Sequence, residues 1–143
     1  MIIENIFTSR ILGLDYGEKR IGVSISDPLR ITAQPLPTIN YENEKQLWIN
    51  LDQLFQELEI EKIVIGLPIN MNGSFGISSQ KVEMFAKKIE DRFKLEVELL
   101  DERLTSSVAE NTIRELGKKP SKNKDKIDKL AAILILQSYL DKN

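Results

Sequence analysis

Four carboxylates at three places in the chain could take part in metal-assisted chemistry. Asp15 closes a short apolar run just ahead of Gly17, a residue that permits close approach of a ligand. Asp101 and Glu102 close a second apolar run, and Asp128 lies in the first turn predicted for the last helix. Ligands of open sheets bind at the carboxyl ends of parallel strands, so oxygen ligands at these points could hold a cation.

Each of these side chains also has an ordinary structural role. Asp15 could cap its own turn, and Asp128 would be stabilised by the dipole of its helix. Asp101 and Glu102 point to opposite faces if the strand continues, so only one of them should reach a common site. Against the ordinary role of Asp128, the helix is apolar on nearly all sides over residues 127–140, and a buried carboxylate is costly unless paired or metal-bound. Asp125 is the predicted N-cap of this helix and a weaker candidate.

The composition of the 143-residue chain excludes several kinds of active site. The sequence contains no histidine and no cysteine, which rules out Ser-His-Asp and Cys-His catalysis, disulfides and Cys/His zinc sites. Carboxylates favour hard cations such as Mg²⁺ or Mn²⁺. Two such ions about 4 Å apart can activate water and stabilise the leaving oxygen of a phosphodiester, with no need for an imidazole base.

Basic residues near these carboxylates suggest a partner that carries phosphate. The net charge of −2 counts against nucleic-acid binding by the molecule as a whole. Six lysines fall within residues 118–129, however, and although composition alone predicts a solvated loop, this segment leads directly to Asp128. Lys19, Arg20 and Arg103 also lie beside the predicted strand ends and could contact phosphates.

Hydrophobic periodicity predicts the elements that must position these residues. Period-two segments predict strands over residues 11–15, 21–26, 31–39, 62–66 and 95–100, with Pro35 and Pro37 restricting the third strand to a sheet edge. Helical stripes predict helices over residues 47–58, 82–93, about 107–116 and about 126–141, and a loop over residues 70–79. Ser107 and Glu110 have capping-box spacing at the start of the third helix, and Gly117 follows its end.

This order of elements predicts one α/β domain over residues 1–143, with a mixed sheet and helices on both faces. No apolar run reaches the ~18–20 residues of a membrane span, so no membrane association is expected and the cytoplasm is the expected location.

Four segments together resemble the motifs of the YqgF family, whose members are described as Holliday junction resolvases and as nucleases of the 16S rRNA precursor. They are LDYGEKRIGVS at 14–24, IGLPINMNG at 65–73, DERLT at 101–105 and DKLAAILILQ at 128–137. The resemblance spans most of the chain. It implies a ribonuclease H-like fold with a five-stranded mixed sheet, three strands antiparallel and two parallel. It also implies a metal-dependent nuclease that processes the 5′ end of pre-16S rRNA.

The resemblance also implies a carboxylate site of Asp15, Glu102 and Asp128, and the nuclease hypothesis assigns roles to individual residues. Asp15 would bridge two Mg²⁺ or Mn²⁺ ions, while Glu102 and Asp128 would each anchor one, which favours Glu102 over Asp101. Lys19, Arg20, Arg103 and Asn70 would contact the substrate. The chain departs from the family at Asn72, where an acidic residue is common, so this loop position is not expected to bind metal.

Other functions remain open at this point. The same carboxylates could serve a junction-specific DNA endonuclease, whose symmetric cutting would require two active sites and therefore a homodimer rather than a monomer. A nucleic-acid-binding module without catalysis is the third possibility, and ribosomal particles are a possible partner of an rRNA-processing protein. Residues 13–17 also resemble the phosphate motif of actin-like ATPases, but those proteins clamp nucleotide between two domains and this chain has room for one.

Overall fold

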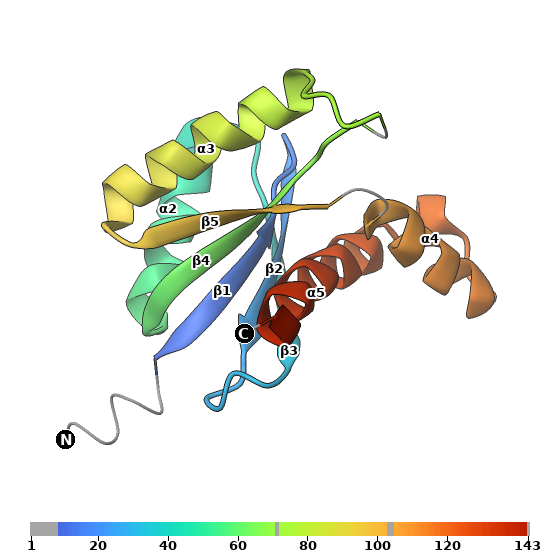
Figure 1. Ribbon diagram of the computed structural model, residues 1–143, viewed down its shortest axis with the longest axis horizontal. Helices are drawn as coiled ribbons and strands as arrows, with labels where there is room; N and C mark the ends of the chain where they lie inside the picture. The colour runs from blue at the N-terminus through green and yellow to red at the C-terminus, as the bar shows by residue number, and fades with distance from the viewer. Residues whose placement is uncertain (1–8, 71, 103–104, 143) are drawn as a thin grey trace.

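A five-stranded sheet of order β3-β2-β1-β4-β5 forms the centre of the molecule (Figure 1). The computed structural model describes residues 9–70, 72–102 and 105–142. β1 (Arg10–Asp15), β2 (Arg20–Ser26) and β3 (Ala33–Asn40) form an antiparallel meander. β4 (Ile60–Leu67) pairs parallel with β1, and β5 (Glu96–Asp101) pairs parallel with β4. The predicted mixed sheet is therefore confirmed, with the proline-bearing β3 at its edge.

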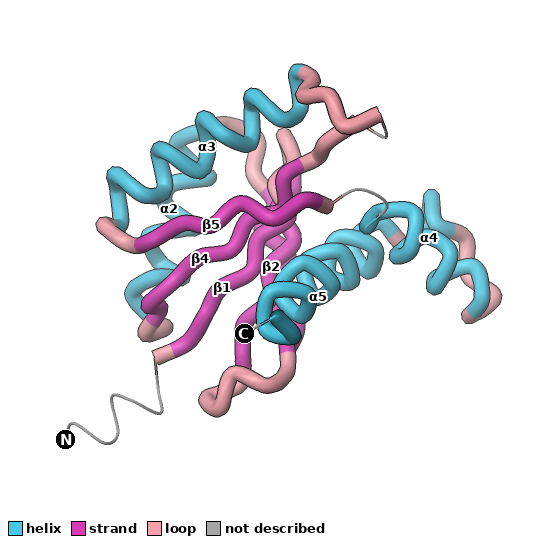
Figure 2. The backbone as a smooth tube through the Cα atoms, viewed as in Figure 1, coloured by secondary structure: helices cyan, strands magenta, loops and turns pink. Residues whose placement is uncertain are grey.

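Helices cover both faces of this sheet, as predicted. They are α2 (Glu44–Glu57), α3 (Ile77–Phe93), α4 (Thr105–Glu115) and α5 (Lys124–Lys142), with a 3₁₀ turn η1 (Pro120–Lys122) between the last two. α2 and α3 lie on one side of the sheet and α5 lies on the other, with α4 packed against α5 (Figures 1 and 2). In the part of the chain described, no helix is long and apolar enough to cross a membrane.

The alternation of side chains along the strands divides the core into two layers. Leu12 and Leu14 of β1 belong to the larger cluster, which β1, β2 and β4 form with α2 and α3. Ile11 belongs to a smaller cluster with Leu136 and other apolar residues of α5. Since successive strand residues point to opposite faces, Asp15 lies on the same side as Ile11, toward α5.

Small residues on the α5 side of the sheet allow this helix to approach very closely. A Cβ atom on Gly22 would lie 2.2 Å from the carbonyl oxygen of Asp128, and one on Gly13 would lie 2.7 Å from the Cβ of Leu136. The buried Ser24 hydroxyl donates a hydrogen bond of 2.7 Å to the carbonyl oxygen of Ala132. The backbone of α5 therefore rests directly on β1 and β2, which fixes the height and rotation of the helix.

All four helices begin earlier than predicted, and for the first two a side-chain contact gives the reason. α2 starts at Glu44, capped by the Asn43 side chain, which accepts a hydrogen bond of 2.9 Å from the Gln46 amide. α3 starts at Ile77 rather than near residue 82, because the buried Ser79 hydroxyl donates to the Pro68 carbonyl and fixes the first turn against the end of β4. The predicted loop over residues 70–79 is accordingly shorter.

Two predicted caps in the C-terminal part are wrong, and one helix end is confirmed. α4 starts at Thr105, so Ser107 lies inside the helix rather than at its cap. α5 starts at Lys124, which places Asp125 in the first turn and Asp128 in the second. The end of α4 is as predicted, since Gly117 has φ +76° and its amide donates to the Arg114 carbonyl, closing the helix with a left-handed residue.

We predict that Gly22→Ala lowers the free energy of unfolding by about 2 kcal/mol or more, because the added methyl group meets helix backbone that cannot rotate away. Urea denaturation measures the change. Gly76→Ala is the matched control: its Cβ would lie 3.5 Å from the Asn70 side chain, an ordinary contact, and we expect a change below about 1 kcal/mol. Equal effects of the two substitutions would show that α5 does not pack this closely.

Candidate active site

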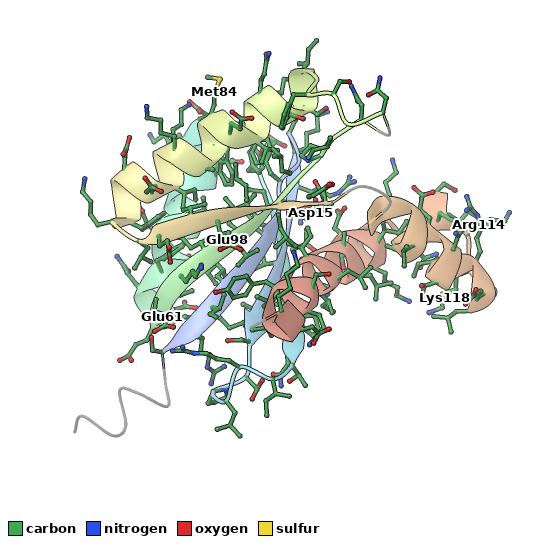
Figure 3. All side chains as sticks on the ribbon, in the orientation of Figure 1. Asp15, Glu61, Met84, Glu98, Arg114 and Lys118 are labelled. Carbon is green, nitrogen blue, oxygen red and sulfur yellow. The ribbon has the colours of Figure 1, made fainter. Side chains whose placement is uncertain are left out.

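The carboxyl end of β1 opens into a cleft that contains all three carboxylates implied by the family resemblance. The cleft has a volume of about 510 Å³ and is lined by Asp15, Glu102 and Asp128, together with residues of the β1–β2 turn and the start of α3. Figure 3 shows Asp15 at the end of the sheet beside α5. Each of the three side chains is partly buried. Folding thus brings together groups that are 87 and 113 residues from Asp15 along the chain.

Asp15 and Glu102 form a hydrogen-bonded acid pair. Burial and the negative charge of Asp128 raise the pKa of Asp15 to about 6, while the hydrogen bond with Glu102 acts in the opposite direction. Burial, the charge of Asp15 and the same hydrogen bond raise the pKa of Glu102 to about 8. At neutral pH Glu102 therefore retains a proton and donates it to the Asp15 carboxylate.

Glycine at position 66 provides the space that the Glu102 carboxylate occupies. A Cβ atom on Gly66 would lie 2.7 Å from Oε2 of Glu102. The Glu102 amide donates to the Leu67 carbonyl at 3.1 Å, so the ladder between β4 and β5 continues one residue past β5. Leu100 packs in the cluster under α5, and the two-residue period then places Glu102 on the same face and Asp101 on the other.

Asp128 is held by an ion pair with Arg20. The Nε atom of Arg20 donates to Oδ2 of Asp128 at 2.7 Å, and the two side chains are 39% and 18% exposed. Arg20 is the first residue of β2 and lies on the α5 side of the sheet, two residues before Gly22, over which α5 packs. The sequence suggested Arg20 as a phosphate contact, and its pairing with Asp128 was not predicted.

The three carboxylates are not arranged as a complete set of metal ligands in this structure. Among residues 9–70, 72–102 and 105–142, no group of three acidic side chains has a geometry that could hold an ion as it stands. Asp128 is instead paired with Arg20, and the Glu102 carboxyl is hydrogen-bonded to Asp15. The donor set is nevertheless entirely oxygen, which suits a hard divalent cation.

Cationic side chains border the same cleft. Lys19 lies in the tight β1–β2 turn and Arg20 follows it, and a Cβ atom on Gly17 of this turn would lie 2.5 Å from the Arg20 carbonyl oxygen. Lys81 of α3 also lines the cleft and pairs with Glu18. We did not predict Lys81 from the sequence, because helical spacing indicates which face is buried but not which distant strand end that face meets.

Other candidate residues lie elsewhere. Asn70 lies in the turn after β4 and donates to the Ser74 hydroxyl at 3.0 Å, and it does not line the cleft. Asp125 does not line the cleft and forms an ion pair with Lys129 at 3.3 Å. Arg103 falls outside the described residues.

A second groove adjoins the cleft between α4, η1 and α5. It has a volume of about 580 Å³, and Arg20 and Asp128 line both hollows. Arg114 and Lys124 line its far wall. Lys118, labelled with Arg114 in Figure 3, lies close enough to Lys126 to lower the pKa of the Lys126 ammonium group. The lysine-rich segment thus forms a basic surface on the flank of the carboxylates.

Comparison with known proteins agrees with the resemblance seen in the sequence. A relative from Listeria monocytogenes serotype 4b (strain CLIP80459), named "Putative pre-16S rRNA nuclease", is 50% identical over 134 residues, which cover 92% of this chain and 97% of the relative. A relative of the same name from Ruminiclostridium cellulolyticum is 47% identical over 134 residues and covers 93% and 94% of the two chains.

Solved structures share the fold at low sequence identity. Thermus thermophilus RuvC, solved in complex with a Holliday junction substrate, superposes with a TM-score of 0.56 at 12% identity and covers 94% of both chains. The fowlpox virus resolvase, solved with its Holliday junction substrate, gives a TM-score of 0.53 at 11% identity and covers 93% of this chain and 97% of the resolvase. The family model described as "RuvX: Holliday junction resolvase" matches residues 9–142, and the chain belongs to this RuvX (YqgF) family.

Proposed function

We propose that this protein is a metal-dependent nuclease that cleaves precursor rRNA at the 5′ end of the 16S sequence. The observation that carries the proposal is that the partly buried carboxylates of Asp15, Glu102 and Asp128, the carboxylate trio, meet at the end of the central strand in a cleft bordered by cationic side chains. Relatives about half identical to this chain carry the corresponding name. A phosphodiester hydrolase needs both a group that stabilises developing negative charge and a means of holding phosphate.

The chemistry of the carboxylates fits a divalent cation. Burial and repulsion by neighbouring carboxylates raise the pKa values of Asp15 and Glu102, and a bound cation would offset both effects. Asp15, Glu102 and Asp128 would hold Mg²⁺ or Mn²⁺ through oxygen atoms alone. Such an ion supplies a water of lowered pKa and stabilises the leaving oxygen. With no histidine in the chain, none of the protein's side chains offers an imidazole for proton transfer.

The cations around the cleft suit a nucleic-acid strand. Lys19, Arg20 and Lys81 border the carboxylates and would neutralise phosphates on either side of the cleaved bond. The segment from Arg114 to Lys129 carries seven basic and three acidic side chains, a local charge of +4 in a chain of net charge −2. The basic surface therefore favours a polyanion at one side of an otherwise acidic molecule.

A DNA junction is the second candidate substrate, because the matching family model is described as a Holliday junction resolvase. Phosphate chemistry is the same for both substrates, and the difference lies in strand geometry. Cleavage of precursor rRNA and of a four-way DNA junction by the same preparation, compared side by side, distinguishes them. Cleavage of the junction alone would contradict the rRNA proposal.

We predict that Asp15→Asn, Glu102→Gln and Asp128→Asn each reduce Mg²⁺-dependent cleavage of precursor rRNA. The expected loss of cleavage rate is at least about 100-fold. Substituting a residue that only hydrogen-bonds a metal ligand already lowers metal affinity or activity ~10–100-fold, and these carboxylates would bind the ion directly. Initial rates in Mg²⁺ and in Mn²⁺ measure the effect.

The chain offers a matched control for two of these carboxylates. Asp101→Asn changes the acid next to Glu102 on the opposite strand face, and Asp125→Asn changes the acid paired with Lys129 one turn before Asp128. We expect both controls to retain activity within about threefold of wild type. If Asp15→Asn cleaved normally, the protein would not use this site, and a binding role without catalysis would be favoured.

The acid pair also predicts a pH dependence of stability. In the metal-free protein the pKa values of Asp15 and Glu102 are raised above those of the unfolded chain, so the folded state binds more protons between about pH 4 and pH 8. The free energy of unfolding should therefore fall as pH rises through this window. We expect a loss of about 2 kcal/mol, less than the full shifts imply because water screens these partly exposed groups.

Urea denaturation in EDTA between pH 5 and pH 8.5 measures this dependence, and Mg²⁺ should restore stability at the alkaline end. Glu102→Gln removes one member of the acid pair and should flatten the curve. A stability that does not change over this range, or that rises with pH, would contradict the assigned proton sharing.

The basic surface predicts how RNA binding depends on salt. Lys118→Gln combined with Lys126→Gln should weaken RNA binding and reduce the slope of log K against log salt by about 1.4, or about 0.7 for each lost phosphate contact on a single strand. Lys87→Gln with Lys88→Gln, on the exposed side of α3, removes the same charge and should change the slope little. An identical change in both double variants would show that only net charge matters.

A further inference from the structure

Arg20 stands at the boundary between two hollows and is bound to one of the proposed metal ligands. It lines both the active cleft and the groove between α4 and α5. Its Nε atom donates to Asp128 at 2.7 Å. The structure records no hydrogen bond from its two Nη groups to any described residue, and its side chain is 39% exposed. The planar Nη face of the guanidinium is thus open to an incoming acceptor.

The ion pair and a cation compete for the same carboxylate. With Asp128 paired to Arg20, no three acidic side chains within the described residues can hold an ion as they stand. Closing the trio around a cation brings a second positive charge next to the guanidinium, which weakens its attraction to Asp128. A guanidinium released from a carboxylate can bind a phosphate instead, because its planar pair of N–H donors matches two oxygen atoms of either group.

We propose that Arg20 is a positioning residue that exchanges Asp128 for a phosphate of the nucleic acid when the cation binds. In the metal-free protein Arg20 is the counter-ion of Asp128. In the loaded protein the cation takes over that carboxylate, and the Nη groups of Arg20 bind the nucleic-acid backbone at the boundary of the cleft and the groove. This inference rests on the proposed function, because it requires the carboxylate trio to bind a cation.

The exchange couples the two ligands thermodynamically. If the cation frees Arg20 for phosphate, then the cation tightens nucleic-acid binding, and nucleic acid must tighten cation binding by the same factor. Lys19 borders the same cleft but has no recorded ion pair with the trio, so it should affect affinities only as a nearby charge. Arg20 and Lys19 are therefore a matched pair for testing the exchange.

The test measures Mn²⁺ affinity of the full chain by electron paramagnetic resonance, without nucleic acid. Arg20→Gln should bind Mn²⁺ about fivefold more tightly than wild type or better, because it removes the competitor for Asp128. Lys19→Gln and Arg20→Lys should remain within about twofold of wild type, the latter because a cation still faces Asp128. Binding of a nuclease-resistant 2′-O-methyl phosphorothioate RNA should tighten about fivefold with Mn²⁺ in wild type and much less in Arg20→Gln.

A measurement on the unaltered protein guards against a variant that fails to fold. The ¹⁵Nε–¹H resonance of Arg20 should move on titration with Mg²⁺ and move again on addition of the resistant RNA. Three results would each overturn the exchange. Arg20→Gln could bind Mn²⁺ no more tightly than wild type, or Lys19→Gln could gain as much affinity as Arg20→Gln. The Arg20 resonance could also stay unchanged while Mg²⁺ binds. Failure of wild type to bind Mn²⁺ at all would instead remove the proposed metal centre, and the exchange with it.

Discussion

The close contact between α5 and the first two strands is the constraint on which the site depends. Gly13 and Gly22 leave no side chain between the sheet and the helix, and the hydrogen bond from Ser24 to the Ala132 carbonyl fixes the helix along the strands. A carboxylate on the second turn of α5 reaches the end of β1 only because the helix backbone lies this close. Any larger residue at these glycines would displace Asp128 together with the helix.

The two-residue period of the strands determines which side chains face α5 and which face α2 and α3. On the α5 side the sheet presents small residues in its middle and functional side chains at one end, where Asp15, Arg20 and Glu102 face the start of α5. The opposite face carries the apolar side chains that pack against α2 and α3. One face of the sheet therefore forms most of the core, while the other face contributes fewer apolar side chains and holds the charged groups of the site. Without a cation, burial of Asp15 and Glu102 on this face destabilises their charged forms and raises both pKa values.

The sequence allowed the order and type of the elements to be predicted, because the change from period two to helical period is a local signal. Helix starts were less predictable, since α3 begins where Ser79 reaches the end of β4 through a contact that no local pattern encodes. Periodicity alone could not choose between Asp101 and Glu102, because it shows that they point to opposite faces but not which face meets α5. The family resemblance favoured Glu102, and its proximity to Asp15 and Gly66 places it in the cleft. The pairing of Arg20 with Asp128, 108 residues apart, depends on the tertiary packing of α5.

Anomalous diffraction from a crystal soaked in Mn²⁺ tests the central claim most directly, because it locates the ion without relying on activity or on a substituted protein. The account predicts anomalous density between the carboxylates of Asp15, Glu102 and Asp128, with the Arg20 guanidinium no longer bound to Asp128. Density only at other surface carboxylates, with Asp128 still paired to Arg20 and Glu102 still hydrogen-bonded to Asp15, would contradict it.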